Sequence, residues 1–181
     1  MDKTGTITEG RPRVTDVEVF GADEGELMRI AAALESGSEH PLAEAVLEYA
    51  REKGVAAKPA EEFEALFGRG VRGSVDGKVY YAGNSSLMEE RGITVEEKIA
   101  GRLNEFADQG KTPLLFADEK AVIGVLAVAD VEKESSREAI KAFSDMKIDV
   151  VMLTGDNKRT AEALRKRLHI PKVIAEVLPS D

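Results

Sequence analysis

The sequence contains no cysteine and no tryptophan, and aromatic residues make up only 5% of its 181 positions. Without cysteine, the chain can neither form disulfides nor bind a metal through thiolates. Its longest apolar run, "AVIGVLAVA" at residues 121–129, includes a glycine and falls well short of the roughly 20 residues that cross a bilayer. A basic segment followed by an apolar one, the pattern of a signal peptide, is also missing. The sequence therefore predicts a cytosolic chain.

Positive charge is scarce as well. Lysine and arginine number 25 against 34 acidic residues, which gives a net charge of −9. Such a chain repels a nucleic-acid backbone, and no basic stripe with interleaved aromatic residues offsets the repulsion. We therefore expect no nucleic-acid partner. The hydrophobic fraction of 43% is enough for ordinary globular cores, so an anionic ligand has to be held by local groups or by a metal ion.

Apolar periodicity and turn residues predict an α/β chain. Asp23 is a plausible helix N-cap, Pro41 fits a first helical position, and Asp76-Gly77 is the pair that a tight hairpin prefers. After Ser135 the alternation of helix and strand is typical of a parallel sheet, unlike the antiparallel middle of the chain. The predicted strands are 11–20, 71–75, 78–82, 112–118, 121–130, 148–156 and 172–177, and the predicted helices are 23–37, 40–54, 84–92, 94–110 and 158–168.

Three glycines in "GRGVRG", Gly68, Gly70 and Gly73, match the dinucleotide-binding fingerprint letter for letter. That fingerprint has to open a helix, whereas a hairpin follows here, so the dinucleotide interpretation is disfavoured. The glycines either supply turns and bulges in the sheet or let the phosphates of a ligand approach the backbone closely. The pattern alone leaves both alternatives open.

His40 and Glu35 are ambiguous in the same way. A histidine before Pro41 at a helix start is commonly a local capping residue, and an isolated helical glutamate is commonly a solvated one. Their interpretation depends on what the two ends of the chain do.

Both ends carry residues that suit phosphoryl transfer. In "DKTGT" a carboxylate, Asp2, precedes a lysine and two threonines, and in "VVMLTGDN" an apolar strand delivers "TGD" at its C-terminal tip, where parallel sheets hold ligands. A carboxylate nucleophile can take a phosphoryl group when a divalent cation neutralises the repulsion between the two anions. Thr4 cannot act as a general acid and base to hydrolyse the product, so we expect a long-lived aspartyl phosphate. That favours a pump over a phosphatase.

In this order and at these separations, "DKTGTITEG", "SEHPLAEAV", "GRGVRG" and "TGDN" resemble the cytoplasmic ATP-binding region of P-type ATPases. "SEHP" and "GxG" point to the heavy-metal-transporting branch, and the resemblance covers essentially the whole chain. It implies that ATP and Mg²⁺ are the cofactors and that the full protein is an integral membrane pump with this part on the cytosolic side.

The resemblance also implies roles for individual residues. Asp2 is the phosphorylated aspartate, with Lys3 beside it in the catalytic motif, and the backbone carbonyl of Thr4 joins Asp2 in binding Mg²⁺. In the inserted domain, His40 lies against the adenine ring and the Glu35 carboxylate faces its exocyclic amine.

The remaining implied roles concern the phosphates. Thr6 with Thr154 and Gly155 contacts the phosphoryl oxygens, and Asp156 helps to hold the nucleotide and the domain closure. The family function of the glycine pair is to let the phosphates pass close to the backbone at Gly68 and Gly70.

Other positions match the family less completely. Asp130 and Lys133 occupy its hinge, where a basic side chain can reach the nucleotide, although a surface ion pair at a helix start is an equal alternative. Arg91 replaces an asparagine that some copper transporters carry, whereas Asn84 is retained.

The resemblance implies the following architecture. An antiparallel-sheet α+β nucleotide-binding domain, residues 11–126, is inserted into a partial Rossmann-like phosphorylation domain of the haloacid-dehalogenase type, residues 1–10 and 127–181. We expect the chain to be a monomeric excerpt that lacks the strand before Asp2 and the downstream "GDGxND" segment, and hence to be catalytically incomplete.

The implied partners are ATP and the rest of the same transporter, namely its membrane helices and actuator domain. The function expected of the whole protein is export of a heavy metal, with copper favoured. A soluble haloacid-dehalogenase-type phosphatase and an ATP-binding module without turnover remain the alternatives.

Overall fold

The computed structural model describes residues 1–21, 23–56, 58–154 and 158–177 of the chain, and it contains two compact units. The first unit combines Met1–Pro12, Asn104–Lys111 and Ala129–Asp181, and the second combines Arg13–Leu103 and Thr112–Val128. Each unit is described separately below. The predicted domains, residues 11–126 inserted between residues 1–10 and 127–181, stay a prediction.

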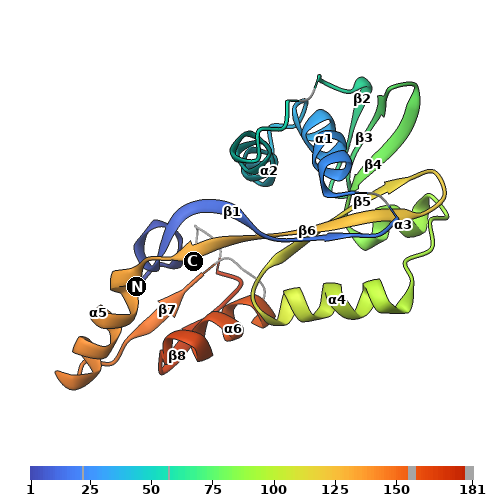
Figure 1. The fold of residues 1–181 in the computed structure, drawn as a ribbon. Helices are drawn as coiled ribbons and strands as arrows, with labels where there is room; N and C mark the ends of the chain where they lie inside the picture. Colours follow the sequence, from blue (N-terminus) through green and yellow to red (C-terminus); the bar gives the residue numbers. More distant parts are fainter. Residues whose placement is uncertain (22, 57, 155–157, 178–181) are drawn as a thin grey trace. The chain divides into compact units, whose positions relative to one another are not determined.

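A six-stranded sheet dominates the second unit, with the strand order β1-β6-β5-β4-β3-β2 (Figure 1). Each consecutive pair from β2 to β6 in the chain is antiparallel, which confirms the antiparallel middle predicted from the sequence. The first residues of β1 and the last residues of β6 belong to the first unit. The strands are β1 (Thr8–Val19), β2 (Glu61–Leu66), β3 (Gly70–Val75), β4 (Lys78–Gly83), β5 (Thr112–Asp118) and β6 (Val122–Glu132).

The predicted hairpin joins β3 to β4. Val75 pairs with Lys78, so Asp76 and Gly77 alone form the connection, and their φ angles are +52° and +76°. Positive φ at both central residues is what a type I′ turn requires, and aspartate and glycine tolerate it best. The prediction from the Asp-Gly pair is confirmed.

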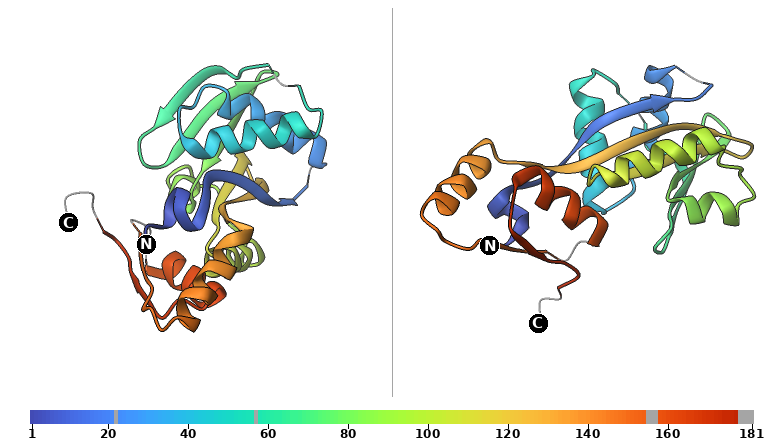
Figure 2. Two further views of the ribbon diagram at one scale, coloured as in Figure 1. Left: turned by 90° about the vertical axis from the view of Figure 1, so that its left-hand side faces the viewer. Right: turned by 90° about the horizontal axis from the view of Figure 1, so that it is seen from below.

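The predicted helices of this unit are also confirmed. Helices α1 (Glu24–Glu35) and α2 (Pro41–Glu52) cover one face of the sheet, while α3 (Ser85–Glu90) and α4 (Glu97–Asp108) lie over the other, as the views in Figures 1 and 2 agree. Asp23 caps α1 by accepting the Glu26 N–H at 2.9 Å. Within the described ranges, no helix combines the length and the apolar composition needed to cross a membrane.

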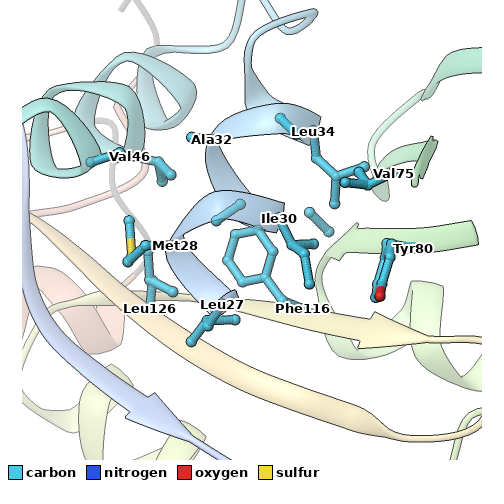
Figure 3. Close-up of a cluster of buried hydrophobic side chains, with 14 of the residues drawn as sticks. Leu27, Met28, Ile30, Ala32, Leu34, Val46, Val75, Tyr80, Phe116 and Leu126 are labelled. Carbon is cyan, nitrogen blue, oxygen red and sulfur yellow. The ribbon is translucent and has the colours of Figure 1, made fainter. Parts of the chain in front are cut away.

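Helix α1 is the centre of the hydrophobic core. From Leu27 to Glu35 every residue except Arg29 is buried. Its apolar side chains pack against Phe116 and Leu126 from the sheet (Figure 3). The approach is close: a Cβ atom added to Gly124 of β6 would lie 2.3 Å from Leu27 Cδ2. Glycine at this position lets the helix lie directly on the strand.

The first unit contains a β-α-β arrangement. Strands β7 (Val151–Leu153) and β8 (Lys172–Ile174) pair in parallel, and α6 (Lys158–Leu168) makes the crossover that a parallel pair needs. Helix α5 (Glu134–Asp145) precedes β7. The parallel α/β prediction is confirmed, but both strands are shorter than predicted because the pairing extends over only these residues. Their buried side chains form a separate core of Ile7, Ile140, Val150, Met152, Ala161, Leu164, Leu168 and Ile170.

The burial of Leu27 predicts a large effect of truncation. Leu27→Ala should lower the free energy of unfolding of the second unit by about 2–5 kcal/mol, because the rigid sheet cannot collapse into the cavity. Urea denaturation monitored by circular dichroism measures this loss. Leu47→Ala, in the partly buried part of α2, serves as the control and should lose clearly less. Equal losses in the two variants would contradict the central packing role of α1.

Candidate functional site

In the first unit, the residues from Asp2 to Thr8 form a loop that we call the aspartate loop (residues 2–8). Asp2 forms a parallel bridge with Leu153, and the Leu153 N–H donates to the Met1 carbonyl at 2.8 Å. The start of the chain thus lies along β7 and fixes Asp2 at the C-terminal end of that strand. The neighbouring strand β7 thus supports Asp2 from the side, while the absence of a strand leading into Asp2 stays a prediction.

The aspartate loop closes as one wide turn, η1 (Lys3–Ile7), in which the Thr8 N–H donates to the Lys3 carbonyl. Gly5 has φ +75°, a left-handed conformation that glycine adopts without strain. Gly10, with φ +72°, packs back on this turn: a Cβ atom added to it would lie 3.1 Å from Gly5 Cα. The two glycines in "DKTGTITEG" therefore set the path of the loop.

The Asp130 carboxylate ties the loop to β6. Its Oδ2 lies 2.5 Å from the Thr8 hydroxyl, and its Oδ1 accepts the N–H groups of Gly10 and Arg11 at 2.9 and 3.2 Å. The Thr8 hydroxyl is also 3.0 Å from the Lys3 carbonyl, but its single proton can be donated to only one acceptor at a time. Asp130 thus holds both the end of the loop and the strand that follows.

Lys133 and Ser136 complete this network. The Lys133 ammonium donates to the Gly5 carbonyl at 2.5 Å, and the buried Ser136 hydroxyl donates to the Ile7 carbonyl at 2.7 Å. Of the two interpretations given to Asp130 and Lys133, the ion pair between them is not found among the described residues. Both side chains instead bind the segment of residues 5–11 that follows Asp2.

Thr154 is the residue after Leu153 and is 5% exposed. The structure therefore brings Thr154 to the end of β7 beside Asp2, as predicted, while Asp2, Thr4 and Thr6 are exposed and Lys3 is partly exposed. The other two predicted members of this group, Gly155 and Asp156, lie outside the described residues. An exposed carboxylate among hydroxyl groups at a strand end has the composition that a phosphoryl acceptor requires.

In the second unit, Glu35 ends α1 and is only 5% exposed. No hydrogen bond or ion pair to its carboxylate occurs in the part of the chain that the structure describes. Burial without a partner disfavours the charged form and raises the pKa of Glu35 from 4.5 to about 7. A buried carboxyl group of this kind is more common at functional sites than elsewhere.

His40 is exposed at the start of α2, and its role as a cap is confirmed. Its Nδ1 accepts the Leu42 N–H at 3.2 Å, and Pro41 fills the first helical position. Because Nδ1 accepts, the neutral ring carries its proton on Nε2, which leaves the ring face and one donor available. Capping and ligand binding are therefore compatible at this residue.

The predicted glycines lie where β2 turns into β3, in a segment that we call the glycine turn (residues 67–70). Gly68 has φ +67° and is exposed. Gly70 pairs with Gly83, and a Cβ atom at Gly70 would lie only 2.0 Å from the Ala82 carbonyl oxygen. Gly70 is thus required by the sheet itself, whereas nothing surrounds the position of a Cβ at Gly68. The hairpin after these glycines excludes the dinucleotide interpretation.

The end of α1, which carries Glu35, packs on the two strands that the glycine turn connects, β2 and β3. A Cβ atom at Gly73 of β3 would lie 3.1 Å from Leu34, and one at Gly37 would lie 2.8 Å from the Phe63 ring of β2. The segment that carries Glu35 therefore packs on the strands that the glycine turn connects. Gly70 is three residues from Gly73, or about 10 Å along the strand.

The family described as haloacid dehalogenase-like hydrolase matches residues 1–181. The chain belongs to that family. Among solved structures, a zinc-transporting PIB-type ATPase in its E2.Pi state is similar to this chain, with a TM-score of 0.86 at 34% identity over 99% of this chain and 29% of the other.

Two bacterial relatives give the same result. Copper-exporting P-type ATPases of Staphylococcus aureus and Staphylococcus epidermidis are 41% and 39% identical over 181 residues, which is 100% of this chain. The chain spans 22% of the length of each of these relatives. The resemblance to heavy-metal P-type ATPases that the motifs indicate is confirmed.

Sequence reasoning missed the residues that hold the aspartate loop. Thr8, Gly10 and Ser136 were assigned no role, and their contacts to Asp130 and to the loop join segments more than a hundred positions apart. The threonine and glycine in "TITEG" are the only local signal for them. These contacts hold the loop that follows Asp2.

The raised pKa of Glu35 predicts how stability depends on pH. The folded state binds the Glu35 proton more tightly than the unfolded state, so this stabilisation is complete below pH 4.5 and is lost as the pH rises through about 7. The difference corresponds to roughly 3 kcal/mol. Glu35→Gln cannot ionise, so its free energy of unfolding should rise relative to wild type by up to that amount between pH 4.5 and pH 8.

Urea unfolding of both proteins at several pH values measures this difference. Glu44→Gln, on an exposed position of α2, is the matched control. A difference between wild type and Glu35→Gln that stays constant with pH would show that Glu35 is not buried as described.

Proposed function

We propose that the chain is the ATP-binding region of a heavy-metal-exporting P-type ATPase, and that the whole protein hydrolyses ATP through an aspartyl phosphate on Asp2. The main support is that Asp2 is held beside Thr154 at the end of β7. A second support is the sequence similarity: all 181 residues of this chain align with a copper-exporting P-type ATPase at 41% identity.

The second unit is proposed to bind the nucleotide. The exposed His40 ring packs on the adenine, and the Glu35 carboxyl, which has no protein partner among the described residues, receives the exocyclic amine. The open space at Gly68 lets the phosphates approach the backbone. Gly70 contributes indirectly, because it keeps β3 against β4 behind the turn.

The first unit is proposed to accept the phosphoryl group. An Asp2 carboxylate oxygen attacks the γ-phosphorus, and the bond from that phosphorus to the bridging oxygen breaks, with ADP as the leaving group. Thr6 and Thr154 donate hydrogen bonds to the phosphoryl oxygens, with Gly155 and Lys3 as further members of the site and Asp156 holding the nucleotide. Because misplacement of a reacting group by about 1 Å can reduce the rate about 10²-fold, the contacts of Asp130 and Lys133 to the loop serve this step.

The residues fit a Mg²⁺ ion that is bound mainly by substrate and water. No group of three or more acidic or histidine residues suited to a metal occurs among the described residues. The exposed Asp2 carboxylate and the Thr4 carbonyl are therefore the proposed protein ligands, which suits the preference of Mg²⁺ for a few oxygen ligands plus phosphate oxygens. When bound, Mg²⁺ offsets the repulsion between Asp2 and the γ-phosphate.

The transported metal is proposed to be copper, because the relatives in Staphylococcus are named as copper exporters. The remaining parts of such a transporter, its membrane helices and actuator domain, are the proposed partners, with this region on the cytosolic face. Thr4 is the argument against a simple phosphatase, since a threonine there cannot serve as the general acid and base that releases phosphate.

Nucleotide binding is tested at His40. His40→Ala should weaken ATP binding to this chain by about 1–2 kcal/mol, the scale of one lost aromatic contact. Isothermal titration calorimetry measures the change. His40→Asn keeps an acceptor at the helix cap but lacks the ring, so it should lose similar affinity without destabilising α2. His169→Ala, which removes the other histidine of the chain, is the control. Unchanged affinity in both His40 variants would exclude the adenine contact.

Phosphoryl transfer is tested at Asp2 in a full-length protein that carries this chain. Incubation with γ-labelled ATP and Mg²⁺ should leave an acid-stable, hydroxylamine-labile label that disappears in Asp2→Asn and persists in Asp149→Asn, at an exposed control position. A full-length protein that binds ATP without acquiring this label would falsify the proposed reaction. Release of phosphate from small esters would then favour the phosphatase alternative.

A further inference from the structure

Asn84, between β4 and α3, uses both ends of its side chain. Its Oδ1 accepts the Leu87 N–H at 3.1 Å and so caps α3, while its Nδ2 donates to the Gly68 carbonyl at 3.1 Å. Only this orientation of the amide satisfies both contacts, because the first partner is a donor and the second an acceptor. The residue therefore links the start of α3 to the glycine turn.

The link continues through the backbone. The Asn84 N–H donates to the Arg69 carbonyl at 3.0 Å, so two successive carbonyl groups of the glycine turn accept hydrogen bonds from this one residue. The turn is closed from within by the Arg69 N–H, which donates to the Leu66 carbonyl at 2.9 Å. At the other end of α3, Glu90 forms an ion pair with the Arg69 guanidinium at 2.5 Å.

The α3 side of the turn is unsuited to phosphate. A hollow of about 380 Å³ lies there, lined by Arg69, Ser86, Glu89 and Glu90. Its two carboxylates outnumber the single guanidinium, which Glu90 already neutralises. An anion is therefore repelled from this side, and the contacts made from it hold the turn rather than receive a ligand.

We infer that Asn84 is a positioning residue that holds the glycine turn in its binding conformation before any nucleotide arrives. The inference rests on the proposed function, in which phosphates approach the backbone at Gly68. Gly68 has no Cβ and adopts positive φ, so its own conformational preference is weak and the turn needs an external restraint. The Nδ2 bond to the Gly68 carbonyl supplies that restraint.

The test separates positioning from direct contact with the nucleotide. Asn84→Ser keeps a side-chain oxygen that can cap α3, adds no charge, and removes the amide donor to Gly68. Without nucleotide, the Arg69 amide should exchange its hydrogen about 10-fold faster in this variant, because the turn opens more often. The affinity for ATP should fall about 3- to 10-fold, and the affinity for adenosine, which has no phosphate, should not change.

Hydrogen exchange by NMR and calorimetric titration of this chain give the two readouts. Ser85→Ala, at an exposed neighbouring position of α3 with no contact to the turn among the described residues, should change neither. Asn84→Asp is the second variant: it keeps the cap, replaces the donor by an oxygen that faces the Gly68 carbonyl, and should also accelerate exchange of the Arg69 amide. That readout does not depend on how the added charge affects ATP.

Weaker ATP binding with unchanged exchange at Arg69 would overturn the inference and identify Asn84 as a direct contact. Faster exchange with unchanged ATP affinity would overturn it as well, because the order of the turn would then not matter for binding. If wild type itself failed to bind ATP, the proposed function would fail, and the exchange data would still report separately on the bond between Asn84 and the turn.

Discussion

The second unit depends on the burial of α1 against the sheet. Leu27 touches the backbone of β6 at Gly124, and Leu34, about two turns further along the same helix face, touches β3 at Gly73. At both contacts a leucine side chain packs directly on the backbone of a glycine. Close packing at two points prevents the helix from sliding along its axis. This packing also buries Glu35, the last residue of the helix. The unusual carboxyl group is thus a consequence of how the helix is anchored.

In the first unit, the residues that follow Asp2 are held in place while the Asp2 side chain stays exposed. Asp2 is at a strand end, and the strand alone does not determine where the following residues go. Asp130, Lys133 and Ser136 bind three backbone segments of residues 5–11, so the restraint acts on the main chain and leaves the carboxylate accessible. In the proposed phosphoryl transfer, a loop that is already ordered needs no further ordering during the reaction.

Local signals were enough to predict the helices, the hairpin and the change from antiparallel to parallel sheet. The Asp23 cap, Pro41 and Asp76-Gly77 act over a few residues, so their consequences can be predicted without the fold. The lengths of β7 and β8 could not be predicted in this way, because a strand ends where its pairing with the neighbouring strand ends. The contacts of Thr8 and Lys133 could not either, since their partners lie 122 and 128 positions away in the sequence. For Glu35 the sequence indicated a helix end, and only tertiary packing buries it.

The pairing of Met1 with β7 has a consequence for the order of folding. Asp2 bridges Leu153, and the two residues lie far apart in the sequence, so this edge of the first unit cannot form until distant parts of the chain meet. The entropy of closing a loop grows slowly with its length, but contacts of such high sequence separation form late. A compact second unit shortens the segment that must be closed. We therefore expect the segment around Asp2 to become ordered late, after the second unit has formed.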